Sequence, residues 1–145
     1  MQQRVEVSDG YSGTPLAKKL GIQGDVVFTV LHAPPGFTEL LGDTGEAIWQ
    51  RNLMLPVDVM VAFFTQRTRL RTEWPDLTEA AQPDGAVWVA WPKKTSGVAS
   101  DITEDTLRAD LLKTNWVDNK VCAIDDTWSA LRFVLRKEHR HARKR

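Results

Sequence analysis

Residues 25–32 (DVVFTVLH) decide the fold of this chain, because they form a nearly continuous apolar, β-branched run. Gly24 bounds the run on one side, and the turn residues Pro34, Pro35 and Gly36 bound it on the other. A short apolar run between turn residues is typical of a strand that is covered on both faces of a sheet. We therefore expect residues 25–32 to form the central strand of a parallel sheet.

A short helix is predicted just before this strand, in residues 14–22 (TPLAKKLGI). Thr14 is expected to cap the helix by accepting a backbone N–H, and Pro15 suits the first helical position, where no donor is needed. Gly21 permits the left-handed residue that ends a helix, so that Ile22 can fold back on the last turn.

Two further buried strands and a helix between them follow. The strands are predicted at residues 57–64 (VDVMVAFF) and 86–91 (AVWVAW). Pro75 lies inside the helical pattern, so we expect the helix to kink there or to restart with Pro75 as its first residue. The apolar residues at helical spacing are Leu70, Trp74, Leu77 and Ala81.

The remaining elements complete the alternation of strands and helices. Residues 37–41 predict a short helix, and residues 46–53 (EAIWQRNL) predict a weaker strand. Capping residues at 100–104 predict a helix that runs to about residue 115. Strands at 120–124 and 128–135 are separated by only three residues, a gap that suits a hairpin and excludes a parallel crossover.

This order predicts an α/β fold, a three-layer Rossmann-like open sheet that is mostly parallel and has a C-terminal antiparallel hairpin. In such sheets a ligand binds beyond the carboxyl ends of the strands, at the point where the strand order reverses. The loops expected at that edge are residues 32–36, 65–67, 92–97 and 125–128.

Composition and charge indicate one globular domain with a basic end. The 145 residues are 42% hydrophobic and 26% charged, which suits a single domain, and we assign it to residues 1–136. Residues 136–145 hold six of the 19 Lys and Arg but one of the 19 Asp and Glu, so the body is acidic. We interpret residues 137–145 as a flexible, solvated tail. Contact with nucleic acid or another acidic partner is the alternative.

Several classes of protein are excluded by what the sequence lacks. No apolar run approaches the roughly 20 residues of a membrane helix, and residues 1–10 do not resemble a signal peptide, so we expect a cytoplasmic protein. Cys122 is the only cysteine, which rules out an internal disulfide, and its apolar neighbours favour a packing role over a nucleophilic one. His139 and His141 have no cluster of ligands around them, so no metal site is expected.

Three segments carry a resemblance to a known family: residues 10–16 (GYSGTPL), 91–97 (WPKKTSG) and 117–129 (VDNKVCAIDDTWS). Together they resemble the bacterial DUF3052 family, whose function is unknown. The resemblance covers nearly the whole chain and implies no catalytic or ligand residues. More distantly, the helix ending in KKLGI before the first strand and the closing hairpin look like S-adenosylmethionine-dependent methyltransferases in their layout.

The sequence departs from that second likeness where the cofactor would bind. An adenosyl cofactor usually needs a glycine-rich turn after the first strand and an acidic residue beyond the second strand. Residues 32–37 read HAPPGF, with one glycine and two prolines that lack N–H donors, and Arg51 and Asn52 stand near the end of the second predicted strand.

The best candidate site is the loop that follows the third buried strand. Two ammonium groups, two hydroxyls and a glycine can hold a phosphate or a carboxylate. A solvated surface loop is the alternative interpretation. The loop residues are Lys93, Lys94, Thr95, Ser96 and Gly97.

Other residues of the same edge are candidates with ordinary alternatives. His32 is either a general base or phosphate ligand, or a structural residue at a strand end. Asp125, beside Asp126, is either a ligand group or part of the hairpin turn. Tyr11 and Ser12 form either a lid over a ligand or an ordinary turn. The candidate set is completed by Gly36 and Trp128.

These residues predict an accessory or regulatory domain that binds a small anionic ligand or a protein partner. Two alternatives are kept: a transferase that uses an adenosyl cofactor in an atypical pocket, and nucleic-acid contact through residues 137–145. Neither a catalytic residue, a cofactor nor an oligomeric state is assigned from the sequence.

Overall fold

The computed structural model describes residues 14–143, so Tyr11 and Ser12 lie outside the described residues. It contains a six-stranded sheet in the order β2-β1-β3-β4-β6-β5. Within the described residues only β6 runs against the other strands, because it pairs antiparallel with both β4 and β5. The strands are β1 (Val27–Leu31), β2 (Ile48–Trp49), β3 (Val57–Phe63), β4 (Ala81–Pro92), β5 (Trp116–Ala123) and β6 (Trp128–Leu135). The predicted mostly parallel sheet with a C-terminal antiparallel hairpin is confirmed.

One face of the sheet is covered by the two longest helices, α3 (Arg67–Ala80) and α4 (Glu104–Leu111). Leu70 and Leu77 of α3 and Leu107 of α4 are at most 1% exposed and belong to one apolar cluster with the sheet. Trp74 of α3 meets Phe133 of β6 edge-on, with 5.7 Å between the ring centroids. This face holds the larger part of the core.

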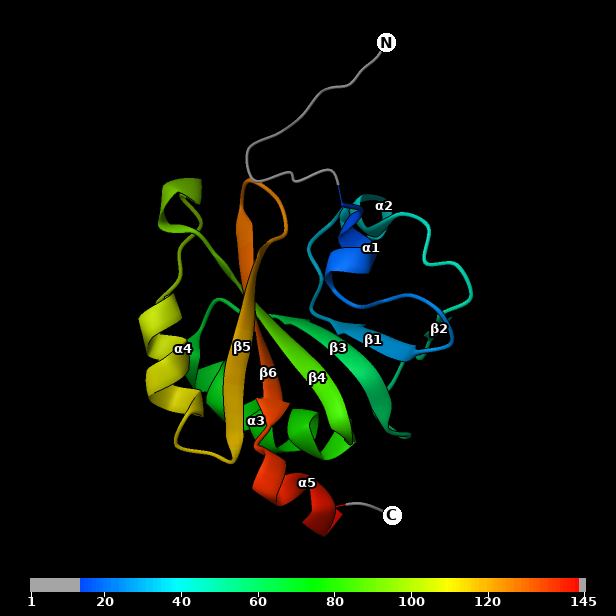
Figure 1. The fold of residues 1–145 in the computed structure, drawn as a ribbon. Helices are drawn as coiled ribbons and strands as arrows, with labels where there is room; N and C mark the ends of the chain where they lie inside the picture. Colours follow the sequence, from blue (N-terminus) through cyan, green and yellow to red (C-terminus); the bar gives the residue numbers. More distant parts are fainter. Residues whose placement is uncertain (1–13, 144–145) are drawn as a thin grey trace.

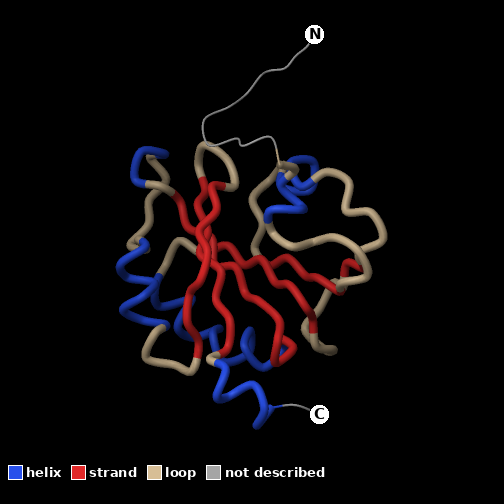
Figure 2. Tube along the Cα trace, in the orientation of Figure 1, coloured by secondary structure: helices blue, strands red, loops and turns tan. Residues whose placement is uncertain are grey.

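The opposite face has a thinner cover. It comes from α1 (Leu16–Lys19) and α2 (Phe37–Leu41), which lie together in Figure 1. Leu20 and Phe37 pack with Phe28 and Trp88 of the sheet. The covers of the two faces are unequal, because the second consists of short helices and loops (Figure 2).

The start of the described chain largely follows the sequence prediction. Gly21 has a φ of +82°, and its N–H donates to Lys18 O while Ile22 N–H donates to Ala17 O at 2.8 Å. This is the left-handed helix end that Gly21 predicted. The predicted cap is wrong, because Pro15 occupies the N-cap position and no side chain caps α1.

Two elements differ from their predictions for reasons visible in their contacts. The helix α3 continues through Pro75 instead of restarting there, because Leu70, Trp74 and Leu77 pack on the sheet both before and after it. The weak strand predicted at 46–53 is reduced to β2. Its chain turns away because the Gln50 side-chain amide donates to Asn52 O and Leu55 O.

The basic end of the chain, for which a flexible tail is predicted, begins with a short helix. Residues 137–143 form a helix, α5 (Lys137–Arg143). Its first turn is held to the sheet by Arg136 N–H, which donates to Asn115 O at 2.8 Å, and by Arg140 Nε, which donates to Leu135 O at 2.8 Å. Among residues 14–143, no helix combines the length and the apolar character needed to cross a membrane.

Candidate ligand site at the carboxyl edge of the sheet

The loops that follow β1, β3 and β4 meet the β5–β6 turn at one edge of the sheet, the carboxyl edge. Lys93 N–H donates to Thr127 O at 2.8 Å, which joins the loop after β4 to the hairpin turn. Asp101 N–H donates to Thr65 O at 3.2 Å, which joins the end of β3 to the segment before α4. The strand order reverses between β1 and β3, so this edge is where an open α/β sheet is expected to bind a ligand.

A hollow of about 220 Å³ opens at this edge beside His32. Its lining combines three aromatic rings besides His32 with polar side chains, among them the Arg69 guanidinium of α3. Of the residues predicted as candidates, His32 and Trp128 line it. The lining residues are His32, Phe63, Phe64, Thr65, Gln66, Arg69 and Trp128.

His32 is held in an unusual conformation at the mouth of this hollow. Its φ is +60°, the single positive φ outside glycine in residues 14–143. A left-handed backbone is uncommon for residues with a side chain and often marks a functional position. His32 Nε2 lies 2.8 Å from Glu73 Oε1, and Arg69 Nη2 lies 3.3 Å from His32 Nδ1. The two contacts suit a neutral ring that donates from Nε2 and accepts at Nδ1.

Arg69 and Glu73 form a second contact between themselves, one helical turn apart on α3. Arg69 Nε donates to Glu73 Oε2 at 2.8 Å. Partial burial acts to raise the pKa of Glu73, but the hydrogen bonds from His32 and Arg69 outweigh it and hold that pKa below its ordinary value. Glu73 is therefore a carboxylate at neutral pH. It orients His32 and Arg69 together.

Arg69 keeps unused donors after these contacts are made. Its Nε and Nη2 are engaged, whereas Nη1 has no hydrogen bond to any of residues 14–140. The side chain is 54% exposed and lines the hollow. A guanidinium with free N–H groups beside a cavity is suited to a carboxylate or phosphate, which it can contact with two parallel hydrogen bonds.

The predicted anion loop, residues 93–97, lies beside the hollow but does not line it. Lys93 Nζ donates to Asp125 O at 2.9 Å, so its ammonium group anchors the hairpin turn. Ser96 Oγ donates to Lys93 O at 2.6 Å and accepts from Val98 N–H at 3.2 Å, inside a 3-10 turn over Lys94–Ser96. Within this loop, Lys94 and Thr95 stay exposed. A ligand contact by this loop therefore stays a prediction.

The two remaining candidates have structural contacts as well. Asp125 Oδ1 accepts from Thr127 N–H at 2.9 Å and from Trp128 N–H at 2.7 Å, which is the turn chemistry given as its alternative. This turn places Trp128 edge-on against Phe63, at 5.1 Å between ring centroids. Gly36 has a φ of +88° and open space where a Cβ would lie, so it serves the turn before α2 and not a close approach.

Arg69 and Glu73 were not among the site residues predicted from the sequence. Their spacing of four residues on a predicted helix was a usable signal, because residues i and i+4 lie on the same helix face. Nothing in the sequence indicated that His32, 37 residues before Arg69, would join them. Among the described residues no group of three or more His, Cys, Asp or Glu side chains is arranged to hold a metal ion.

No family model matches the chain, and no curated protein matches it, so membership of the DUF3052 family stays a prediction. Solved structures do match. A SAM dependent methyltransferase from Aquifex aeolicus has a TM-score of 0.59 at 12% identity and covers 81% of this chain and 86% of its own.

Two other solved structures give the same result. A putative type 11 methyltransferase from Sulfolobus solfataricus has a TM-score of 0.57 at 10% identity, with 84% of this chain and 90% of its own covered. The N-methyltransferase NodS from Bradyrhizobium japonicum WM9, in complex with S-adenosyl-L-homocysteine, has a TM-score of 0.53 at 14% identity, with 88% and 93% covered. Likeness at such identities concerns the fold. This chain has the α/β fold of the S-adenosylmethionine-dependent methyltransferases.

Proposed function

We propose that this chain is a binding domain on a methyltransferase-like fold, and that it holds a small anionic ligand in the hollow beside His32. The observation that carries the proposal is the free Nη1 of Arg69, on a guanidinium that is held in place by one hydrogen bond from Nε to Glu73 and one from Nη2 to His32. A guanidinium held in place loses less conformational entropy on binding than a mobile lysine. The anion-binding group is therefore Arg69, in place of the Lys93 ammonium group that the sequence suggested.

The walls of the hollow define the rest of the ligand. Phe63, Phe64 and Trp128 contribute aromatic carbon, but the accessible lining is mainly polar, so the anion would be small and would carry little apolar surface. A volume of about 220 Å³ is below the range of about 300–1,000 Å³ that is usual for drug-sized ligands. A compact carboxylate or phosphate ester fits these limits.

Calorimetric titration of small aromatic and aliphatic carboxylates and phosphate esters, at one ionic strength, tests this proposal. At least one should bind, and Arg69→Gln should weaken it about 10- to 100-fold, because a hydrogen bond to a charged group contributes about 1.5–3 kcal/mol. Lys113→Gln is the matched control, since it removes one exposed positive charge outside the hollow. Equal affinity of Arg69→Gln and the wild type, or no binding by any anion, would refute the proposal.

A second candidate is a transferase that uses an adenosyl cofactor, which the shared fold favours. The residues that would hold the cofactor do not fit it in the usual way. Pro34 and Pro35 offer no N–H groups in the loop after β1. At the end of β2 the Gln50 amide is engaged by backbone carbonyls, and Arg51 lies 3.8 Å over the Trp49 ring, with no carboxylate to take ribose hydroxyls. We assign no methyl-transfer step to these residues.

One titration with S-adenosylmethionine and S-adenosylhomocysteine distinguishes the two candidate functions. Micromolar binding that survives Arg69→Gln would favour the transferase, because its cofactor would then be held elsewhere on the edge. The absence of binding heat at millimolar concentrations of either compound would rule out the transferase.

Nucleic-acid contact through residues 137–145 remains a third prediction. Deletion of those residues should abolish any binding to DNA or RNA at low salt.

A further inference from the structure

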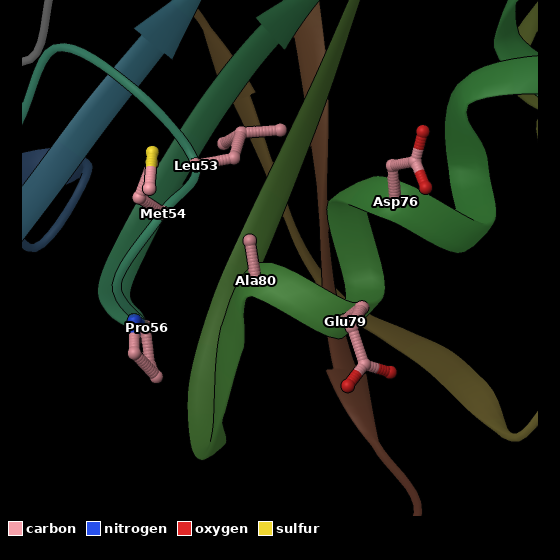
Figure 3. A pocket seen from close by; sticks show the side chains of 6 residues that line it. All are labelled: Leu53, Met54, Pro56, Asp76, Glu79 and Ala80. Atoms are coloured by element: carbon pink, nitrogen blue, oxygen red, sulfur yellow. The ribbon is translucent and has the colours of Figure 1, made fainter.

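A second hollow, of about 440 Å³, lies at the opposite edge of the sheet, the amino edge. Figure 3 shows its two sides: Leu53, Met54 and Pro56 come from the loop before β3, while three residues at the end of α3 face them. Those three residues are Asp76, Glu79 and Ala80. We call this hollow the amino-edge groove. None of the residues discussed for ligand binding lines it.

The groove combines exposed apolar carbon with negative charge. Met54 is 82% exposed, and the neighbouring Leu55 is 66% exposed. Exposed apolar residues that cluster beside polar ones mark interaction surfaces. Asp76 and Glu79 are exposed, and neither takes part in an ion pair with any of residues 14–140. Such a groove suits a segment with lysine or arginine, whose aliphatic stems cover apolar carbon while the charged ends meet carboxylates.

The basic segment of this chain lies at the same edge. Leu135, the last residue of β6, pairs with Trp116 at the start of β5, and Val134 pairs with Ala86 of β4. The helix α5 begins immediately after this point, at the end of the sheet where β3 and β4 start (Figure 1). Arg136 and Lys137 make no ion pair with the described residues. Among residues 137–140, the part of α5 whose side chains are described, none lines the groove of its own chain.

We propose that the amino-edge groove of one copy receives the basic segment at the start of α5 from a second copy. The groove and the segment lie at the same edge of the sheet. Two copies related by a twofold axis can therefore each place the segment in the groove of the other and form a closed dimer. A groove and a segment at opposite ends of the chain would instead extend into a filament. The acidic body and the basic end, which cancel in the net charge of one chain, are complementary between two chains. This dimer does not depend on the proposed ligand site.

Sedimentation and light scattering of the full chain measure the dimer directly. Near 100 µM in low salt the mass should be about twice the 16.4 kDa of one chain, and it should fall toward that of the monomer at about 1 M salt, because exposed ion pairs are screened. A monomer at that concentration in low salt, or a dimer whose affinity does not change with salt, would overturn the proposal.

A charge exchange between groove and segment tests the specific contact. The groove variant carries Asp76→Lys and Glu79→Lys, and the segment variant carries Arg136→Glu and Lys137→Glu. Each variant alone should dimerise at least about tenfold more weakly, since every ion pair becomes a repulsion. An equimolar mixture should recover the dimer, because both contacts then join opposite charges. Asp126→Lys, which reverses an exposed charge on the hairpin turn at the carboxyl edge, should leave the dimer unchanged.

The equimolar mixture of the groove variant and the segment variant decides whether the two copies exchange segments. Recovery of the dimer only on mixing supports the exchange of segments between copies. Dimers of equal strength in both single variants and the wild type would refute it. Met54→Ser provides an independent check that does not alter charge: this exposed side chain contributes nothing to the core, so the variant should fold as the wild type does and dimerise more weakly.

Discussion

Asp110→Asn should destabilise the protein by removing the charge that joins α3 to α4. The Asp110 side chain is 4% exposed and accepts from Arg67 Nε at 2.9 Å, from Arg67 Nη2 at 2.8 Å and from Arg71 Nη1 at 3.3 Å. A hydrogen bond to a charged group contributes about 1.5–3 kcal/mol. Arg67 and Arg71 are 33% and 48% exposed, so water can replace part of the lost contact. We expect a loss of about 2 kcal/mol, or about 4–8 °C in Tm for a chain of this size.

The pH dependence of this loss follows from the direction of the pKa shift. The hydrogen bonds from Arg67 lower the pKa of Asp110 in the folded protein, against the opposing effect of burial. A carboxyl group with a lowered folded pKa stabilises the protein fully above its unfolded pKa, and this contribution disappears as the pH falls through the folded value. The difference between wild type and Asp110→Asn should therefore be largest at neutral pH and shrink in strong acid.

Urea unfolding at a series of pH values, over the range in which the wild type stays folded, measures both effects. Asp126→Asn is the matched control, because Asp126 is exposed on the hairpin turn, and it should change the free energy of unfolding by less than about 0.5 kcal/mol. A loss for Asp110→Asn that is equally small, or that stays constant from neutral pH into acid, would refute the assignment of Asp110 as the charged link between α3 and α4.

Three further changes have clear expected outcomes. Trp88→Phe should lower the free energy of unfolding in urea by about 2–3 kcal/mol, because it leaves a cavity and removes the 3.0 Å hydrogen bond from Trp88 Nε1 to Leu20 O. An unchanged free energy of unfolding would mean that this hydrogen bond contributes nothing. Gly85→Ala should cost about 1–3 kcal/mol by the same measurement, since its Cβ would lie 2.8 Å from Asp58 O, and an unchanged midpoint would contradict that close approach. Burial raises the pKa of the Cys122 thiol more than Lys19 lowers it. A thiol reagent at about pH 8 should therefore react at least about tenfold faster with urea-unfolded protein than with native protein. Equal rates would show that the thiol is accessible in the folded protein.

Most of the fold was predictable because its signals are local. The apolar runs that became β1, β3 and β4 lie between turn residues, and the burial of β3 and β4 follows from their composition. The expectation that residues 25–32 form the central strand is wrong, because β1 is second from the sheet edge, beside the two-residue β2, and is only partly buried. The hairpin followed from the short gap of three residues between the two predicted strands. Pro75 shows the limit of local signals: a proline inside a helix predicts a break, but packing of Trp74 and Leu77 on the sheet keeps α3 continuous.

The candidate site was only partly predictable, because its chemistry depends on contacts between distant residues. The carboxyl edge and the positions of His32 and Trp128 followed from the strand order expected for an α/β sheet. The role of Lys93 did not, since a lysine on a loop gives no sign that a backbone carbonyl 32 residues away will accept its hydrogen bond.

The sequence by itself determined the class of fold, the edge at which we expect a ligand, and the division of charge between an acidic body and a basic end. It could do so because periodicity, turn residues and charge are properties of neighbouring positions. The tertiary structure alone decided which charged groups are engaged and which are free. Lys93 Nζ and Asp125 Oδ1 hold the hairpin turn, and His32 contacts both Arg69 and Glu73, whereas Nη1 of Arg69 has no hydrogen bond to any of residues 14–140. A side chain's hydrogen bonds are set by whatever the packed strands bring within about 3 Å of it, and no local pattern records those neighbours.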